Sequence, residues 1–89
     1  MFTLTDFPYR LTDHARERID ERMISLDWIH RVLQKPQKLE PDPRKPHLTL
    51  AYRVIPEFNN NVLKVVYDSN KTPWLIITVL FDRKYKGKL

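Results

Sequence analysis

The chain contains no cysteine and only one glycine among its 89 residues. Without cysteine there are no disulfide bonds, thiolate metal sites or cysteine nucleophiles, which fits a reducing compartment. The single glycine, Gly87, excludes a glycine-rich phosphate loop. The longest hydrophobic run, residues 74–81, is interrupted by Thr78 and is far too short to span a bilayer. The N-terminus also lacks the pattern of a signal peptide. We therefore predict a soluble, cytoplasmic protein that does not enter a membrane.

The composition predicts one folded domain over residues 1–89. Hydrophobic residues make up 42% of the chain, which is enough for one packed core, and a second core would need a longer chain. The formal net charge is +5, with 16 Lys and Arg against 11 Asp and Glu. A positive surplus favours polyanionic partners such as RNA or DNA, although many small basic domains have no such partner.

The segment LTDHARERIDERM, residues 11–23, predicts the first helix. Thr12 is a suitable N-cap, and Asp13 complements the positive end of the helix dipole. Side chains four residues apart lie on one face of a helix. A hydrophobic stripe is expected at Leu11, Ala15, Ile19 and Met23. A second stripe, along its border, carries His14, Arg18 and Arg22.

The remainder of the chain predicts a second helix followed by strands. Ser25 is an N-cap candidate for a helix over residues 26–34, which Pro36 ends. Four prolines between residues 36 and 46 indicate a loop with a short strand near residues 38–40. Period-two alternation predicts strands over residues 48–55, 62–68 and 74–82, the last being the most apolar and therefore central. The fold class is α+β, with two N-terminal helices packed on a three- to four-stranded antiparallel sheet.

His14 is the candidate general base of the first helix. Near the positive end of the helix its neutral form is favoured, and a neutral imidazole accepts a proton. Free N–H groups at the same end favour a phosphate, and Arg18, one turn later, would stabilise its charge. The alternative is that His14 only caps the helix or packs beside the sheet.

Basic residues on the strands and the C-terminal segment are candidates for contacting a phosphodiester. Arg53 and Lys64 lie in neighbouring predicted strands, and we expect both on a common face. The alternative is a solvent-facing sheet with long aliphatic stems packed along it. Arg83, Lys84 and Tyr85 follow the last strand, where cations contact phosphates and a ring stacks on an unpaired base. A frayed, solubilising tail is the other interpretation.

A metal site is not expected. His30 and His47 have no ligand spacing with His14 or with carboxylates. No cofactor motif is present either.

The segment LTDHARERIDERMISLDWIHRVLQKPQKLEPDP, with the strands LKVVYD and LIITVLFDRK, resembles a bacterial domain-of-unknown-function family. That family has a His-Ala-x-x-Arg-x-x-x-Arg helix motif and is akin to the RelE/barnase-like ribonuclease toxins of the BECR fold. His14, Arg18 and Arg22 match the helix motif. The chain departs from the pattern at Met23, where the family commonly has glycine before Ile-Ser.

The resemblance implies metal-independent RNA cleavage by a toxin of the toxin–antitoxin type. Its substrate would be RNA, free or on the ribosome, and its protein partner would be an antitoxin. The expected catalytic residues are His14, Arg18 and Arg53. The expected RNA-binding residues are Arg22, Lys64, Arg83, Lys84 and Tyr85. The alternative is a non-catalytic module that binds nucleic acid or protein on the same fold, or an interaction protein that dimerises through its aromatic N-terminus.

Overall fold

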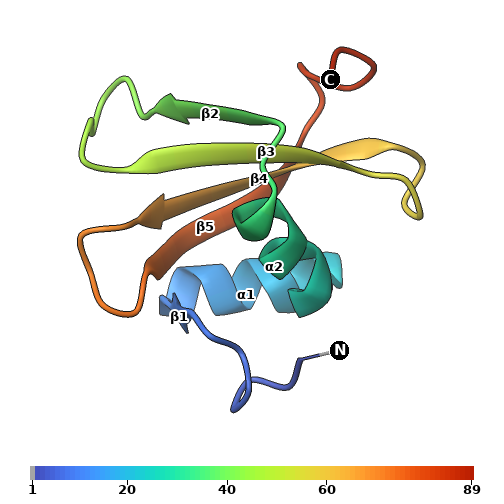
Figure 1. Cartoon of the computed structure of the whole chain (residues 1–89). Coiled ribbons are helices and arrows are strands. Elements are labelled where there is room, and N and C mark those ends of the chain that lie inside the picture. The colour runs from blue at the N-terminus through green and yellow to red at the C-terminus, as the bar shows by residue number, and fades with distance from the viewer. Residues whose placement is uncertain (1) are drawn as a thin grey trace.

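A computed structural model describes residues 2–89 of the chain (Figure 1). Met1, the first residue of the predicted domain, lies outside the described residues. The two helices are α1 (Asp13–Arg22) and α2 (Leu26–Gln34). The five strands are β1 (Arg10–Leu11), β2 (Lys38–Pro41), β3 (Thr49–Ile55), β4 (Asn61–Asp68) and β5 (Leu75–Asp82).

The strands form one mixed sheet in the order β1-β5-β4-β3-β2. The four strands β2 to β5 pair antiparallel, and β1 adds a short parallel partner to β5. The α+β class is confirmed, whereas the prediction of a purely antiparallel sheet of three to four strands is wrong. It missed β1 because two residues show no periodicity. The prediction that residues 74–82 form the central strand is also wrong, because β4 occupies the middle of the order.

Local capping explains why both helices begin where the sequence predicts. The Thr12 hydroxyl accepts a hydrogen bond from the backbone N–H of Ala15 at 3.0 Å and donates to the Ile77 carbonyl at 2.9 Å. The first bond starts α1, and the second fastens that start to β5. Ser25 caps α2 by accepting from the Asp27 N–H at 3.1 Å.

The predicted hydrophobic stripe of α1 is only half present. Ala15 is fully buried and Ile19 packs against the core. Leu11 belongs to β1 instead of the helix. Met23 is the C-cap, has a left-handed backbone with φ of 52°, and is 85% exposed. The helix therefore ends one residue before the stripe would be complete.

Both helices cover the same face of the sheet, as Figure 1 shows. We call this the helix-covered face. Its core includes Ala15, Ile29, Leu63, Val65 and Val79, all fully buried.

The second face carries a smaller hydrophobic cluster, and we call it the open face because neither helix packs on it. Its buried members are Leu48, Leu50, Tyr52, Val62 and Val66. Tyr85, from the segment after β5, packs against them. Leu63, Val65 and Tyr67 of β4 belong to the core of the helix-covered face, whereas Val62 and Val66 belong to the open face, as the period-two alternation of residues 62–68 requires. Within residues 2–89, no helix is long and apolar enough to cross a membrane.

Candidate functional site

Two tyrosines meet on the open face although they lie far apart in the sequence. Tyr52 projects from β3, and its ring centroid is 4.9 Å from that of Tyr85, with the planes at 70°. A turn after β5 brings Tyr85 back onto the sheet. The Asp82 carboxylate starts this turn by accepting a hydrogen bond from the Lys84 N–H at 2.8 Å. Tyr52 is only 2% exposed as a result.

A carboxylate from β2 binds the buried tyrosine. The Tyr52 hydroxyl donates to Glu40 Oε1 at 2.8 Å. Burial, followed by this hydrogen bond to Glu40, raises the pKa of Tyr52 well above its usual range. The phenol therefore stays neutral near pH 7 and acts as a hydrogen-bond donor that orients Glu40.

Three lysines from three segments surround these two rings. Lys64 of β4 lies opposite Tyr52 in the strand register, with its Nζ 5.8 Å from that ring's centroid. Lys38 and Lys84 hold their Nζ atoms 5.5 and 5.6 Å from the Tyr85 centroid. These distances allow cation–π attraction. Lys38 also lies 3.9 Å from Glu40 Oε2. We call this group the open-face cluster; it consists of Lys38, Glu40, Tyr52, Lys64, Lys84 and Tyr85.

The structure brings together three of the predicted site residues, Lys64, Lys84 and Tyr85. Arg83 immediately precedes Lys84 in the C-terminal turn and is exposed. Their convergence gives the open face cations for phosphates and a half-buried aromatic ring for a base. Their role in binding RNA stays a prediction.

Arg53 lies on the helix-covered face, so the prediction that it shares a face with Lys64 is wrong. In the register of β3 with β4, Arg53 pairs with Leu63 and Lys64 pairs with Tyr52. Neighbouring residues of a strand point to opposite faces, and this offset of one residue separates the two cations. Arg53 Nη1 donates to the Lys35 carbonyl at 2.7 Å and so satisfies the end of α2.

The His14, Arg18 and Arg22 stripe lies on α1, on the other side of the sheet from the open-face cluster. His14 is exposed in the first turn, and Arg22 is exposed in the last turn. Arg18 forms a salt bridge with Glu21 of the same helix, with 3.1 Å between the guanidinium nitrogen and the carboxylate oxygen. The three predicted catalytic residues, His14, Arg18 and Arg53, therefore do not meet Lys64, Lys84 and Tyr85.

Sequence reasoning missed Lys38, Glu40 and Tyr52. Tyr52 alternates with Leu50 and Val54 and so resembles an ordinary core residue. Lys38 and Glu40 lie in the short strand β2, two residues apart and therefore on one face. The one signal in the sequence for these residues is a Lys and a Glu two residues apart within the short strand predicted near residues 38–40.

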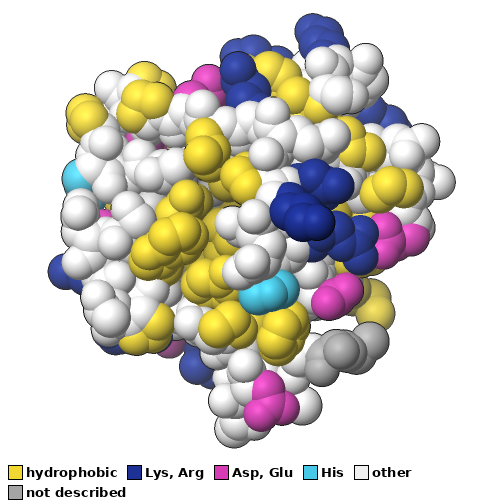
Figure 2. Space-filling view, in the orientation of Figure 1, with side chains coloured by type: hydrophobic (Ala, Val, Ile, Leu, Met, Phe, Trp, Pro, Cys, Tyr) yellow, Lys and Arg dark blue, Asp and Glu magenta, His cyan; other side chains and the backbone are white. Residues whose placement is uncertain are grey.

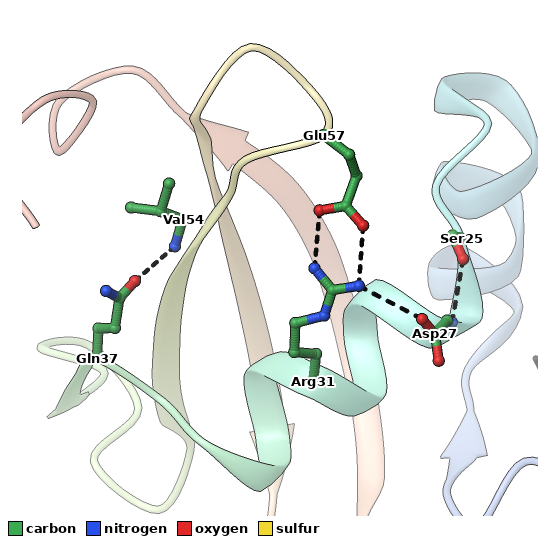
Figure 3. A network of polar contacts seen from close by, with 6 residues as sticks. All are labelled: Ser25, Asp27, Arg31, Gln37, Val54 and Glu57. Atoms are coloured by element: carbon green, nitrogen blue, oxygen red, sulfur yellow. Dashed lines mark hydrogen bonds and ion pairs between the residues drawn. The ribbon is translucent and has the colours of Figure 1, made fainter.

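A second polar network, shown in Figure 3, holds the fold together instead of forming a site. Arg31 of α2 donates to both carboxylate oxygens of Glu57, at 2.8 and 2.9 Å, and lies 3.4 Å from Asp27. The hydrogen bonds from Arg31 lower the pKa of Glu57 to about 2. Nearby, Gln37 Oε1 accepts from the Val54 N–H at 2.7 Å. The Arg31–Glu57 bonds attach the β3–β4 hairpin to α2. The Gln37–Val54 bond attaches the segment before β2 to β3.

Metal-ligating residues do not gather anywhere in the described chain. Among residues 2–89, no group of three or more His, Cys, Asp or Glu side chains is placed to hold a metal ion.

Comparison with known proteins identifies a family but no characterised relative. No curated protein and no solved structure matches the chain. Residues 11–81, which span α1, α2 and strands β2 to β5 almost to its end, match the model of a domain of unknown function, DUF4258. The chain therefore belongs to the DUF4258 family.

Proposed function

We propose that this domain binds single-stranded RNA on its open face. The observation that carries the proposal is the convergence of Lys38, Lys64 and Lys84 on the Tyr52–Tyr85 pair. Lysines neutralise backbone phosphates, and an accessible aromatic ring stacks on an unpaired base. Tyr85 is the half-buried ring of the pair and would stack, while the buried Tyr52 supports it from below.

A salt titration with a charge-matched control tests the binding. A fluorescent single-stranded RNA would be titrated with the wild type and with a Lys38→Ala, Lys64→Ala, Lys84→Ala variant. A second variant, Arg10→Ala, Arg16→Ala, Lys35→Ala, removes the same charge from exposed positions outside the open-face cluster. If the three lysines contact three phosphates, the slope of log affinity against log salt falls by about 2 in the open-face variant. Equal losses in both variants would contradict a site on the open face.

Metal-independent RNA cleavage by a RelE/barnase-like toxin is the second candidate function. Glu40 is the residue that favours this function. A carboxylate among three lysines repels a phosphate and would weaken simple RNA binding, but it can act as a general base that accepts a proton. In such a reaction Glu40 takes the proton of the ribose 2′-hydroxyl, and the 2′-oxygen attacks the adjacent phosphorus. The bond to the 5′-oxygen breaks, that oxygen takes a proton from water, and a 2′,3′-cyclic phosphate remains. Lys38 and Lys64 would stabilise the charge on the phosphorane.

Cleavage can be tested with total RNA in the presence of a metal chelator. Glu40→Gln keeps the acceptor oxygen for Tyr52 but removes the base, so product formation should fall at least about a hundredfold. Glu21→Gln, on the exposed surface of α1, is the matched control. Intact RNA with the wild type would reject the enzyme and leave the binding proposal standing. Cleavage lost in His14→Ala but retained in Glu40→Gln would move the site to α1.

An antitoxin follows from the toxin proposal. A basic domain with a net charge of +5 would be complemented by a small acidic protein, and both would act in the cytoplasm. The test is whether a neighbouring reading frame encodes an acidic protein that co-purifies with this domain. An encoded acidic neighbour that fails to bind would remove the antitoxin from the proposal.

A further inference from the structure

A groove of about 440 Å³ lies at the edge of the fold, away from the open-face cluster. It forms where the β4–β5 loop meets the C-terminal end of α2 and the segment before β1. Figure 2 shows hydrophobic side chains gathered on this side of the molecule, between that loop and α2. The volume is within the range of pockets that hold small ligands.

Aromatic side chains form one wall of the groove. The ring of Trp74 is stacked on Tyr67, with centroids 4.8 Å apart and planes at 19°. Tyr67 is 6% exposed, so Trp74 rests on a buried ring and is held in place. Tyr9 lies 6.0 Å from Trp74, at 30°. Such a fixed, flat wall favours a planar ring as ligand, because little side-chain entropy is lost on binding.

Polar groups at the rim limit the chemistry of that ligand. Gln34 Nε2 donates to the Tyr9 hydroxyl at 3.3 Å, which orients an amide that can bind the edge of a heterocycle. Lys71 is the one charged residue among those lining the groove in the described chain. With a lone ammonium and no lining carboxylate, the groove complements a ligand that carries negative charge.

We propose that this groove binds a single nucleotide. Its base stacks on the wall made by Trp74 and Tyr9, its edge meets Gln34, and its phosphate binds Lys71. The site lies outside the open-face cluster, so the inference does not rest on the proposed RNA binding.

The two tryptophans give an internal control for a test with AMP. Trp74 lines the groove, whereas Trp28 packs beside Phe58 and Phe81. In ¹H–¹⁵N spectra of the full chain, AMP should shift the indole N–H signal of Trp74 and leave that of Trp28 in place. Lys71→Ala should weaken AMP affinity roughly tenfold and leave adenosine affinity unchanged, because one charge-assisted contact is lost. Lys45 is an exposed lysine in the β2–β3 loop. The matched control Lys45→Ala should bind AMP as the wild type does.

Several outcomes would overturn the inference. The first is a Trp74 signal that does not move at AMP concentrations of about 10 mM, above the range of weak specific binding. The second is equal affinity for AMP and adenosine in the wild type, which would remove Lys71 as the phosphate contact. The third is loss of AMP binding in the Lys38→Ala, Lys64→Ala, Lys84→Ala variant, which would place the nucleotide on the open face. Normal AMP binding by that variant supports a separate site, whatever the result with RNA.

Discussion

Tyr52 and Lys64 face each other across β3 and β4, with the Lys64 ammonium 5.8 Å from the centre of the Tyr52 ring. Arg53, one residue further along β3, points to the opposite face of the sheet and binds the end of α2. A single step in the register of β3 with β4 thus separates Lys64, a cation of the open-face cluster, from Arg53, a cation that supports a helix.

Replacing Tyr52 with Phe should destabilise the fold modestly without abolishing RNA binding. The change removes the hydroxyl that donates to Glu40 at 2.8 Å and keeps the ring under Tyr85. A hydrogen bond of this kind contributes about 1 kcal/mol to the free energy of unfolding. Urea denaturation would measure that loss, and RNA affinity should stay within about twofold, less than the effect of one phosphate contact. Tyr85→Ala is the contrasting variant, because it removes the stacking ring and should weaken RNA binding. Stronger loss of binding in Tyr52→Phe than in Tyr85→Ala would contradict this assignment.

Arg53→Ala should lower stability and leave RNA binding unchanged. The guanidinium donates to the Lys35 carbonyl at 2.7 Å, so its loss removes a hydrogen bond that joins β3 to the end of α2. We expect a decrease of about 1 kcal/mol in the free energy of unfolding. The comparison variant is Lys64→Ala, which should weaken RNA binding with little change in stability. If Arg53→Ala removes RNA binding or cleavage at full stability, Arg53 belongs to the site as the sequence first predicted.

Local signals predicted the helices well. Thr12 and Ser25 fix the starts of α1 and α2 through bonds within three residues, and such bonds are readable from sequence. The period-two alternation of residues 62–68 likewise predicted the strand β4, whose alternate residues lie on opposite faces of the sheet. These features depend on neighbours in the chain, so the sequence alone contains them.

The site was harder to predict because it depends on pairing between distant segments. The faces of Arg53 and Lys64 follow from strand register, which a shift of one residue reverses. The contact of Tyr85 with Tyr52 depends on a turn that folds the C-terminal segment over the open face. Residue type therefore indicates Lys64, Lys84 and Tyr85 as candidates, but it does not indicate their companions Tyr52 and Glu40.

The contribution of Glu57 to stability should disappear in acid. Its folded pKa of about 2 lies below the ordinary value of 4.5, mainly because Arg31 donates to its carboxylate. A lowered folded pKa stabilises the native state above pH 4.5, and this stabilisation is lost as the pH falls toward 2. Glu57→Gln should therefore have a lower urea midpoint than the wild type at pH 6, with the difference shrinking at pH values approaching 2. The Glu57 side chain is 48% exposed, so added salt should also reduce the difference. A difference that grows in acid would mean that the Arg31 contact does not set this pKa.

Glycine at position 23 should stabilise the protein. Met23 ends α1 with φ of 52°, a left-handed conformation that costs a residue with a Cβ, and its side chain is 85% exposed and packs little. Glycine adopts this conformation without that cost, and it is the residue that the sequence resemblance leads us to expect before Ile24 and Ser25. The free energy of unfolding should rise by about 0.5–1 kcal/mol in Met23→Gly, measured by urea denaturation. Met23→Ala is the control, because it removes the same exposed side chain but keeps the Cβ, and its stability should stay near that of the wild type. Equal stabilisation by both changes would assign the effect to the methionine side chain and contradict the backbone explanation.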